Sequence, residues 1–211
     1  MKIESVRLIH AQGVPNHYVA NQVYQPLDED HRKRGSFAIL LNHAHTTQGA
    51  FIASLINTLI REYYRNHTPD LLTSFEQTLV RLNEQIRQYT RSRDTIGAID
   101  GVIALLAGDE VHLTHIGKPL AYLSRGSELL ELVETADAKE GETPNFSVIT
   151  SGEIQTDDVL ILLTNLESTE NLKHDIPFSL LQTPLFEAGR AFARIKRGQG
   201  ERAFESVFIR F

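Results

Sequence analysis

The chain has 211 residues, of which 41% are hydrophobic and 23% charged, and this composition suits one globular domain with a substantial core. Its formal net charge of −6 disfavours nucleic acid or an anionic membrane as a general partner. The absence of cysteine excludes disulfides, thiolate metal ligands and a cysteine nucleophile.

No targeting or membrane segment is evident in the sequence. The N-terminal residues lack the long apolar run of a signal peptide. No window holds the roughly 18 consecutive apolar residues that a membrane span requires. We therefore expect a cytoplasmic protein.

The first elements that the sequence predicts are a loop and a strand. Residues 28–34 mix acidic and basic side chains, which is typical of a solvated loop between strands. Residues 36–41 follow as a mostly apolar segment without helical spacing, which predicts a buried strand.

Two long amphipathic helices are predicted next. Apolar residues recur at helical spacing over residues 51–63, after Thr46 and Thr47, either of which can cap a helix. Residues 68–70, Thr-Pro-Asp, predict the cap, first-turn proline and acidic first turn of a second helix. Its apolar residues over 72–89 alternate in steps of three and four, so we expect both helices to pack on a sheet.

Short apolar segments separated by turn residues then predict an antiparallel sheet. The predicted strands cover residues 102–106, 111–116, 120–123 and 129–132. Residues 135–143 are polar and acidic and predict a solvated loop, and residues 150–153 predict a loop that enters a strand.

The last part of the chain predicts a buried strand over 159–163, a helix over 184–197 and a final strand over 206–211. No internal repeat or linker interrupts the sequence. We therefore expect a single α+β domain over residues 1–211.

Six short segments occur in the same order as motifs of a known family. They are Asn21-Gln22-Val23-Tyr24, the segments 37–45, 104–109, 116–123 and 158–166, and the C-terminal strand 206–211. Together they resemble the PP2C-type (PPM) serine/threonine phosphatases, over nearly the whole chain. The segment 116–123, for example, is similar to the family's Val-Gly-Asp-Ser-Arg-Ala-Tyr-Leu.

The resemblance implies a fold and a chemistry. The implied fold is a PP2C-like four-layer α-β-β-α sandwich of two antiparallel sheets flanked by helices. In active members of the family, aspartates at the strand ends bind two Mn²⁺ or Mg²⁺ ions, and a bridging water attacks the phosphate.

This sequence departs from the family at the acidic positions. The residues that stand where the family has its metal-binding acids are Val23, Leu41 or Asn42, Lys118, Asn165, and Ala203 or Phe204. Two family glycines are replaced by His43 and Leu166. A two-metal hydrolase needs several carboxylates to offset about four positive charges. We therefore expect no family-type metal centre and no catalytic residue.

The expected function is that of a catalytically inactive pseudophosphatase, which acts as a protein-binding or regulatory module without a cofactor. Its vestigial cleft would be lined by Asn42, His43, His45, Lys118 and Asn165. With Lys118 as its cation, this cleft is a candidate site for another protein, including a phosphorylated one.

A second reading of the same residues is a divergent metal-dependent phosphohydrolase. His43 and His45 lie two apart at the end of a predicted strand, so both side chains could face one side. Imidazole suits Zn²⁺ better than Mg²⁺, and Asp100 or His115 offers a third ligand. In this alternative the cofactor is a divalent metal, Zn or Mn. Histidines in a polar loop also make ordinary hydrogen bonds, so the sequence leaves both readings open.

Overall fold

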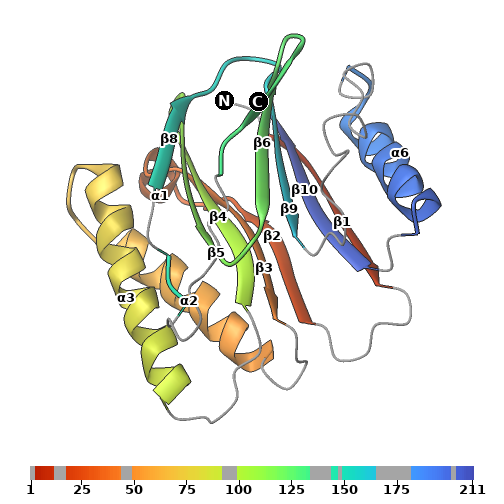
Figure 1. Cartoon of the computed structure of the whole chain (residues 1–211). Helices are drawn as coiled ribbons and strands as arrows, with labels where there is room; N and C mark the ends of the chain where they lie inside the picture. Colours follow the sequence, from red (N-terminus) through yellow and green to blue (C-terminus); the bar gives the residue numbers. More distant parts are fainter. Residues whose placement is uncertain are drawn as a thin grey trace.

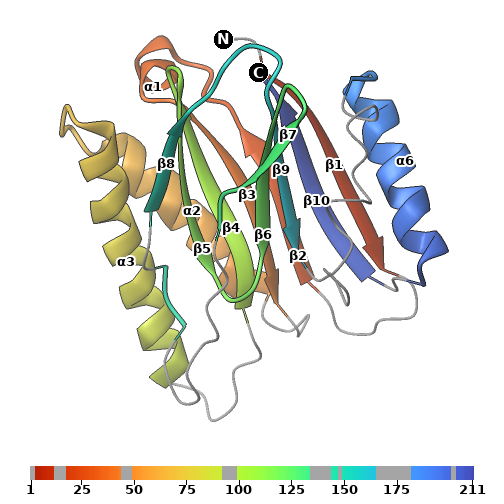
Figure 2. The ribbon, with the colours of Figure 1, turned by 45° about the horizontal axis from the view of Figure 1, so that its top comes forward.

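Two five-stranded antiparallel sheets pack face to face, and helices cover both outer faces (Figures 1 and 2). The computed structural model describes residues 3–11, 18–43, 49–91, 99–133, 144–146, 149–164, 182–200 and 203–211. The arrangement confirms the four-layer α+β sandwich that the family resemblance implies.

Sheet 1 contains the strands in the order β1-β10-β9-β6-β7. Their bounds are Glu4–Ala11 for β1, Ala203–Arg210 for β10, Val159–Thr164 for β9, Leu120–Arg125 for β6 and Glu128–Glu131 for β7. Helix α6, Leu185–Gly198, covers the outer face of this sheet (Figure 1). Phe192 of α6 packs against the rings of Phe204 and Phe208 of β10, so aromatic contacts fix this layer.

Sheet 2 contains the strands in the order β2-β3-β4-β5-β8. Their bounds are Tyr18–Tyr24 for β2, Ser36–His43 for β3, Ile99–Ala107 for β4, Glu110–Ile116 for β5 and Ile149–Glu153 for β8. The antiparallel helices α2, Gly49–Arg65, and α3, Leu71–Arg91, cover its outer face. Among the helices that the structure describes, none combines the length and apolar character needed to cross a membrane.

Alternation along the strands divides the core into three apolar layers. On β3, Phe37, Ile39 and Leu41 pack with α2 and α3, whereas Ala38 and Leu40 pack with the strands of sheet 1. A third layer lies between sheet 1 and α6. Successive side chains of a strand point to opposite faces of the sheet, so the layer to which a strand residue belongs shows which face it lies on.

The charged run at residues 28–34 is helical where the sequence predicts a loop. Helix α1 spans Glu29–Lys33, and the Asp28 carboxylate caps it by accepting the backbone N–H of His31 at 2.8 Å. Acidic residues occupy its first turn and basic residues its last turn, which complements the helix dipole. None of its residues is buried, so the run is solvated as expected.

The start of α3 also differs in detail from the prediction. The Asp70 carboxylate, and not Thr68, caps the helix, because it accepts the backbone N–H groups of Leu72 and Thr73 at 2.9 and 3.3 Å. The capping carboxylate satisfies donors that have no partner inside the helix.

Residues 150–153 form part of strand β8, not the predicted loop. The strand pairs with β5 at the edge of sheet 2, and most of its polar side chains are exposed. It therefore lacks the apolar alternation that makes a strand visible in a sequence. The predicted loop at 135–143 and the capping threonines Thr46 and Thr47 lie outside the described residues.

Candidate functional site

The sequence-predicted site lies at one end of the sandwich. The ends of β1, β3, β5 and β9 and the beginnings of β2, β4, β6 and β10 meet at the lower end in Figure 1. Asn42 and His43 close strand β3, and Lys118 lies in the turn between β5 and β6. His45 and Asn165 lie outside the described residues, so the structure places three of the five predicted residues.

The space between the sheets changes from apolar to polar at this end. Leu40 of β3 lies opposite Val102 of β4, and on sheet 1 Leu162 lies opposite Val207; all four belong to the inter-sheet core. Two residues further along each strand, the inward-facing side chains are the cross-strand pairs Asn42–Asp100 in sheet 2 and Thr164–Glu205 in sheet 1. We call these four residues the polar layer.

Glu205 is the more deeply buried of the two acids of the polar layer. Its side chain is 0% exposed, and the hydroxyl of Thr164 donates to its Oε2 at 2.7 Å. Burying a carboxylate is costly unless hydrogen bonds compensate. The family resemblance places this acid at Ala203 or Phe204, so Glu205 is not among the residues predicted from the sequence. Glu205 precedes the inward-facing residues Val207 and Ile209 by two and four positions. Because every second side chain of a strand lies on the same face, this spacing predicts that Glu205 also faces inward.

The other pair of the polar layer is held by a tight turn. Asp100 Oδ1 accepts the backbone N–H of Lys118 at 2.8 Å, while the Lys118 side chain is exposed. Gly117 makes this contact possible, because it adopts a φ of +73° and a Cβ atom there would overlap the Asp100 carboxylate. Asn42, opposite Asp100, is 4% exposed, and its Oδ1 has no hydrogen-bond partner among the residues that the structure describes.

His115 of β5 flanks the polar layer. It lies opposite Val102 and faces the inter-sheet side, as Val111 and Leu113 do on the same strand. Burial lowers the pKa of His115 below its usual 6.5. Burial therefore disfavours the protonated, positively charged form of the ring. Asp100 and His115 are both partly exposed, so the layer reaches solvent along β4 and β5.

His43 faces away from the polar layer. It alternates with Asn42 on β3 and shares the helix-facing side with Ile39 and Leu41. Its side chain is 0% exposed. The structure thus separates His43 from Asp100 and His115, which the metallohydrolase alternative brings together as ligands. Within the described ranges, no three histidine, aspartate or glutamate side chains lie close enough to hold a metal ion.

Asn21, from the first motif of the family resemblance, joins the two sheets. Its Nδ2 donates to the backbone carbonyls of Leu8 in β1 and Ser206 in β10, at 3.3 and 3.1 Å. These bonds connect the edge strand of sheet 2 to sheet 1 beside the polar layer. The side chain therefore has a structural role at this position.

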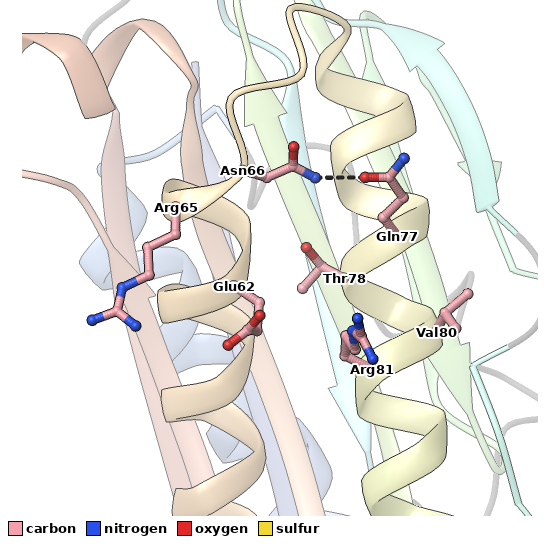
Figure 3. A pocket seen from close by; sticks show the side chains of 7 residues that line it. All are labelled: Glu62, Arg65, Asn66, Gln77, Thr78, Val80 and Arg81. Atoms are coloured by element: carbon pink, nitrogen blue, oxygen red, sulfur yellow. Dashed lines mark hydrogen bonds between the residues drawn. The ribbon is translucent and has the colours of Figure 1, made fainter.

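A groove lies away from the polar layer, on the solvent side of the helix layer. A groove of about 540 Å³ runs between α2 and α3 (Figure 3). Its lining residues are Glu62, Arg65, Asn66, Gln77, Thr78, Val80 and Arg81. Asn66 donates to Gln77 Oε1 at 2.8 Å across the groove. Arg61 pairs with Glu62 and Arg81 with Glu84, so the acidic side chains here already have basic neighbours. The groove shows no reactive arrangement.

Comparison with known proteins identifies the fold. No protein-family model and no curated protein sequence matches the chain. Solved structures do match. The serine/threonine phosphatase PstP/Ppp of Mycobacterium tuberculosis superposes with a TM-score of 0.68 at 15% identity, over 100% of this chain and 98% of that one.

Two further structures agree. PppA of Pseudomonas aeruginosa matches with a TM-score of 0.72 at 14% identity, over 100% of this chain and 98% of that one. The catalytic domain of PstP in complex with two manganese ions matches with a TM-score of 0.69 at 16% identity, over 99% and 97%. The chain therefore has the fold of these serine/threonine phosphatases.

Proposed function

We propose that this chain is a non-catalytic protein on the PP2C fold, a pseudophosphatase that works as a protein-binding or regulatory module. The observation that carries this proposal is the side chain of Asn42. A neutral amide lies near the end of β3, where the family resemblance places a metal-binding acid at Leu41 or Asn42, and Leu41 packs against the helices instead. Amides are weak ligands for Mg²⁺ and Mn²⁺, which prefer charged oxygens.

The charges around Asn42 support the same conclusion. The polar layer has two carboxylates, Asp100 and Glu205, on opposite sheets. Asp100 already accepts the N–H of Lys118, and Glu205 accepts the hydroxyl of Thr164. Two separated acids do not offset the four positive charges of a metal pair. PstP was solved with two manganese ions; here the sequence has Lys118 and Asn165 at two more of the expected acid positions.

The partner we propose is another protein. The partly exposed Asp100 carboxylate repels a phosphoryl group, so it disfavours phosphate at the polar layer itself. Lys118 is exposed at the edge of this end and is the place where a phosphorylated segment would find a cation.

Metal content and phosphatase activity test the proposal together. We expect no stoichiometric Mn, Mg or Zn in the purified protein by elemental analysis. We also expect no turnover of p-nitrophenyl phosphate when any of these ions is added. Stoichiometric metal with turnover that His43→Ala abolishes, and that the exposed control His67→Ala leaves unchanged, would overturn it in favour of the metallohydrolase.

A further inference from the structure

Helix α6 has a positive charge in a chain that is negative overall. The helix has four basic residues and one acidic residue, whereas the whole chain has a formal net charge of −6. Lys196 is buried, and Arg197 lies in the last turn, where a cation complements the helix dipole. Arg190 and Arg194 lie before the last turn and are exposed, so neither core packing nor the dipole accounts for them.

Three arginines and one aromatic ring form a single stripe on the exposed side of α6. In an α-helix, Phe186, Arg190, Arg194 and Arg197 fall within an arc of about 80° around the axis. All four side chains are exposed, Phe186 to 58%, whereas Phe192 and the other buried residues of α6 pack on sheet 1. In Figure 1, α6 lies between sheet 1 and the outside of the molecule. We call these four exposed residues the α6 stripe.

The arginines of the α6 stripe are available to a partner. In the part of the chain that the structure describes, none of the three forms an ion pair, and this includes pairing with Glu187 of the first turn. The Arg190 guanidinium lies 5.7 Å from the centre of the Phe186 ring, and Arg197 Nε donates to the backbone carbonyl of Ala193 at 3.1 Å. These contacts orient the side chains before a partner binds, which reduces the entropy lost on binding.

We propose that the α6 stripe is a docking surface for an acidic segment of a partner protein. The inference rests on the proposed function, because it names the surface and the partner chemistry that a protein-binding module would use. Carboxylates of the partner would pair with the arginines, since a planar guanidinium matches a carboxylate with two parallel hydrogen bonds. An apolar side chain of the partner would cover the Phe186 ring. Arginine and aromatic residues are enriched at protein–protein interfaces, in agreement with this assignment.

A protein segment fits the α6 stripe better than a membrane or a nucleic acid does. An amphipathic helix binds a membrane by burying its apolar face, and the apolar face of α6 already packs on sheet 1. Nucleic acids attract proteins with an extended positive field, which a chain of net charge −6 does not generate. From Phe186 to Arg197 the stripe spans about 16 Å, or roughly three helical turns, so a short acidic segment can cover it.

The direct test is fluorescence anisotropy with a labelled helical peptide that presents glutamates and one leucine on the same face. The matched probe has glutamine in place of every glutamate. We expect saturable binding of the glutamate peptide, which weakens as the NaCl concentration is raised, and no binding of the glutamine peptide. Equal binding of the two peptides would overturn the proposal. Tighter binding to phosphatidylserine vesicles or to a DNA duplex than to the glutamate peptide would overturn it in favour of that partner.

Variants locate the surface. Arg190→Gln combined with Arg194→Gln should weaken binding of the glutamate peptide about tenfold, and Phe186→Ala should weaken it roughly fivefold. The control combines Arg87→Gln with Arg91→Gln, which removes the same charge from two exposed residues of α3 and should leave the affinity unchanged. These side chains are all exposed, so the variants should fold, which circular dichroism checks.

The outcomes separate this inference from the proposed function. Equal losses of affinity in the two double variants would overturn the inference, because they would reflect net charge and not the α6 stripe. Absence of peptide binding in the parent, together with a flat phosphatase assay, would overturn the inference alone. Metal-dependent turnover would overturn the proposed function.

Discussion

The guanidinium of Arg125 and the carboxylate of Asp158 form a bidentate ion pair at the end of the sandwich opposite the polar layer. Arg125 Nη2 lies 2.7 Å from Asp158 Oδ2, and Nε lies 3.1 Å from both carboxylate oxygens. Nη2 also donates to the carbonyl of Glu153 in β8 at 2.7 Å. Since Arg125 belongs to sheet 1 and Glu153 to sheet 2, its side chain connects the two sheets at this end. Asn21 connects them in the same way nearer the end that holds the polar layer.

Removing that pair should destabilise the fold. Asp158 is 3% exposed and also accepts the backbone N–H of Gln155 at 2.8 Å, so Asp158→Ala leaves several donors without their acceptor. We expect the melting temperature to fall by roughly 5 °C or more in a thermal scan. Asp157→Asn is the control, because Asp157 adopts a φ of 70°, which asparagine tolerates. Similar melting of both variants would contradict a special role for the pair.

Gly117→Ala should perturb the polar layer. The new methyl group would overlap the Asp100 carboxylate and strain a left-handed backbone, so we expect a loss of about 2–4 kcal/mol in the free energy of unfolding. Gly126→Ala is the matched control, since Gly126 has a φ of +55° but nothing within 4 Å of its added Cβ. Its cost should be about 1 kcal/mol. Equal costs in denaturant titrations would show that the contact with Asp100 does not matter.

Asn42→Asp should create a divalent-ion site. It places a third carboxylate beside Asp100 and opposite Glu205, and hard cations bind clustered carboxylates. Without metal the variant should be less stable than the parent at pH 7, because like charges then lie close together. We expect Mn²⁺ to bind the variant in electron paramagnetic resonance titrations and to raise its melting temperature. Asn66→Asp, in the groove between α2 and α3, is the control. Failure of Asn42→Asp to bind Mn²⁺ would argue against convergence of the three side chains.

His115 should make stability depend on pH. Burial lowers its pKa in the folded state below the 6.5 of the unfolded chain. Between these two pKa values the unfolded state binds more protons, so the free energy of unfolding rises with pH. The stability is therefore fully present above about pH 6.5 and declines as the pH falls toward the folded-state pKa.

The measurement is the free energy of unfolding between pH 5 and 8 for the parent and for His115→Gln. The variant should lose the part of the pH dependence that lies below pH 6.5. His67→Gln, at an exposed histidine, should retain it. A parent and a His115→Gln protein with identical pH profiles would refute the assignment to His115.

The elements that could be predicted have strong apolar patterns. Helices α2 and α3 and the strands β3 to β6 and β9 occur where the sequence predicts them, and no end differs by more than three residues. Each buries one face or both faces, and this burial imposes the spacing. The helix α1 and the edge strand β8 bury little, so local capping and pairing with β5 decided their structure.

The candidate site could be predicted less well than the fold. The end of β3 was located correctly, but Asn42 and His43 lie on opposite sides of the sheet. Glu205 was not predicted, because the resemblance places the acids before the last strand, whereas Glu205 lies inside β10.

The sequence by itself determined the main helices and strands, because apolar periodicity is a local property, and the family resemblance added the layered architecture and the positions at which acids were expected. Only the tertiary structure decided that Asn42, Asp100, Thr164 and Glu205 share one layer while His43 lies behind the sheet. Strand register and the facing of two sheets bring together residues as far apart in the chain as Asn42 and Glu205. Such pairings depend on long-range packing, which no local pattern encodes.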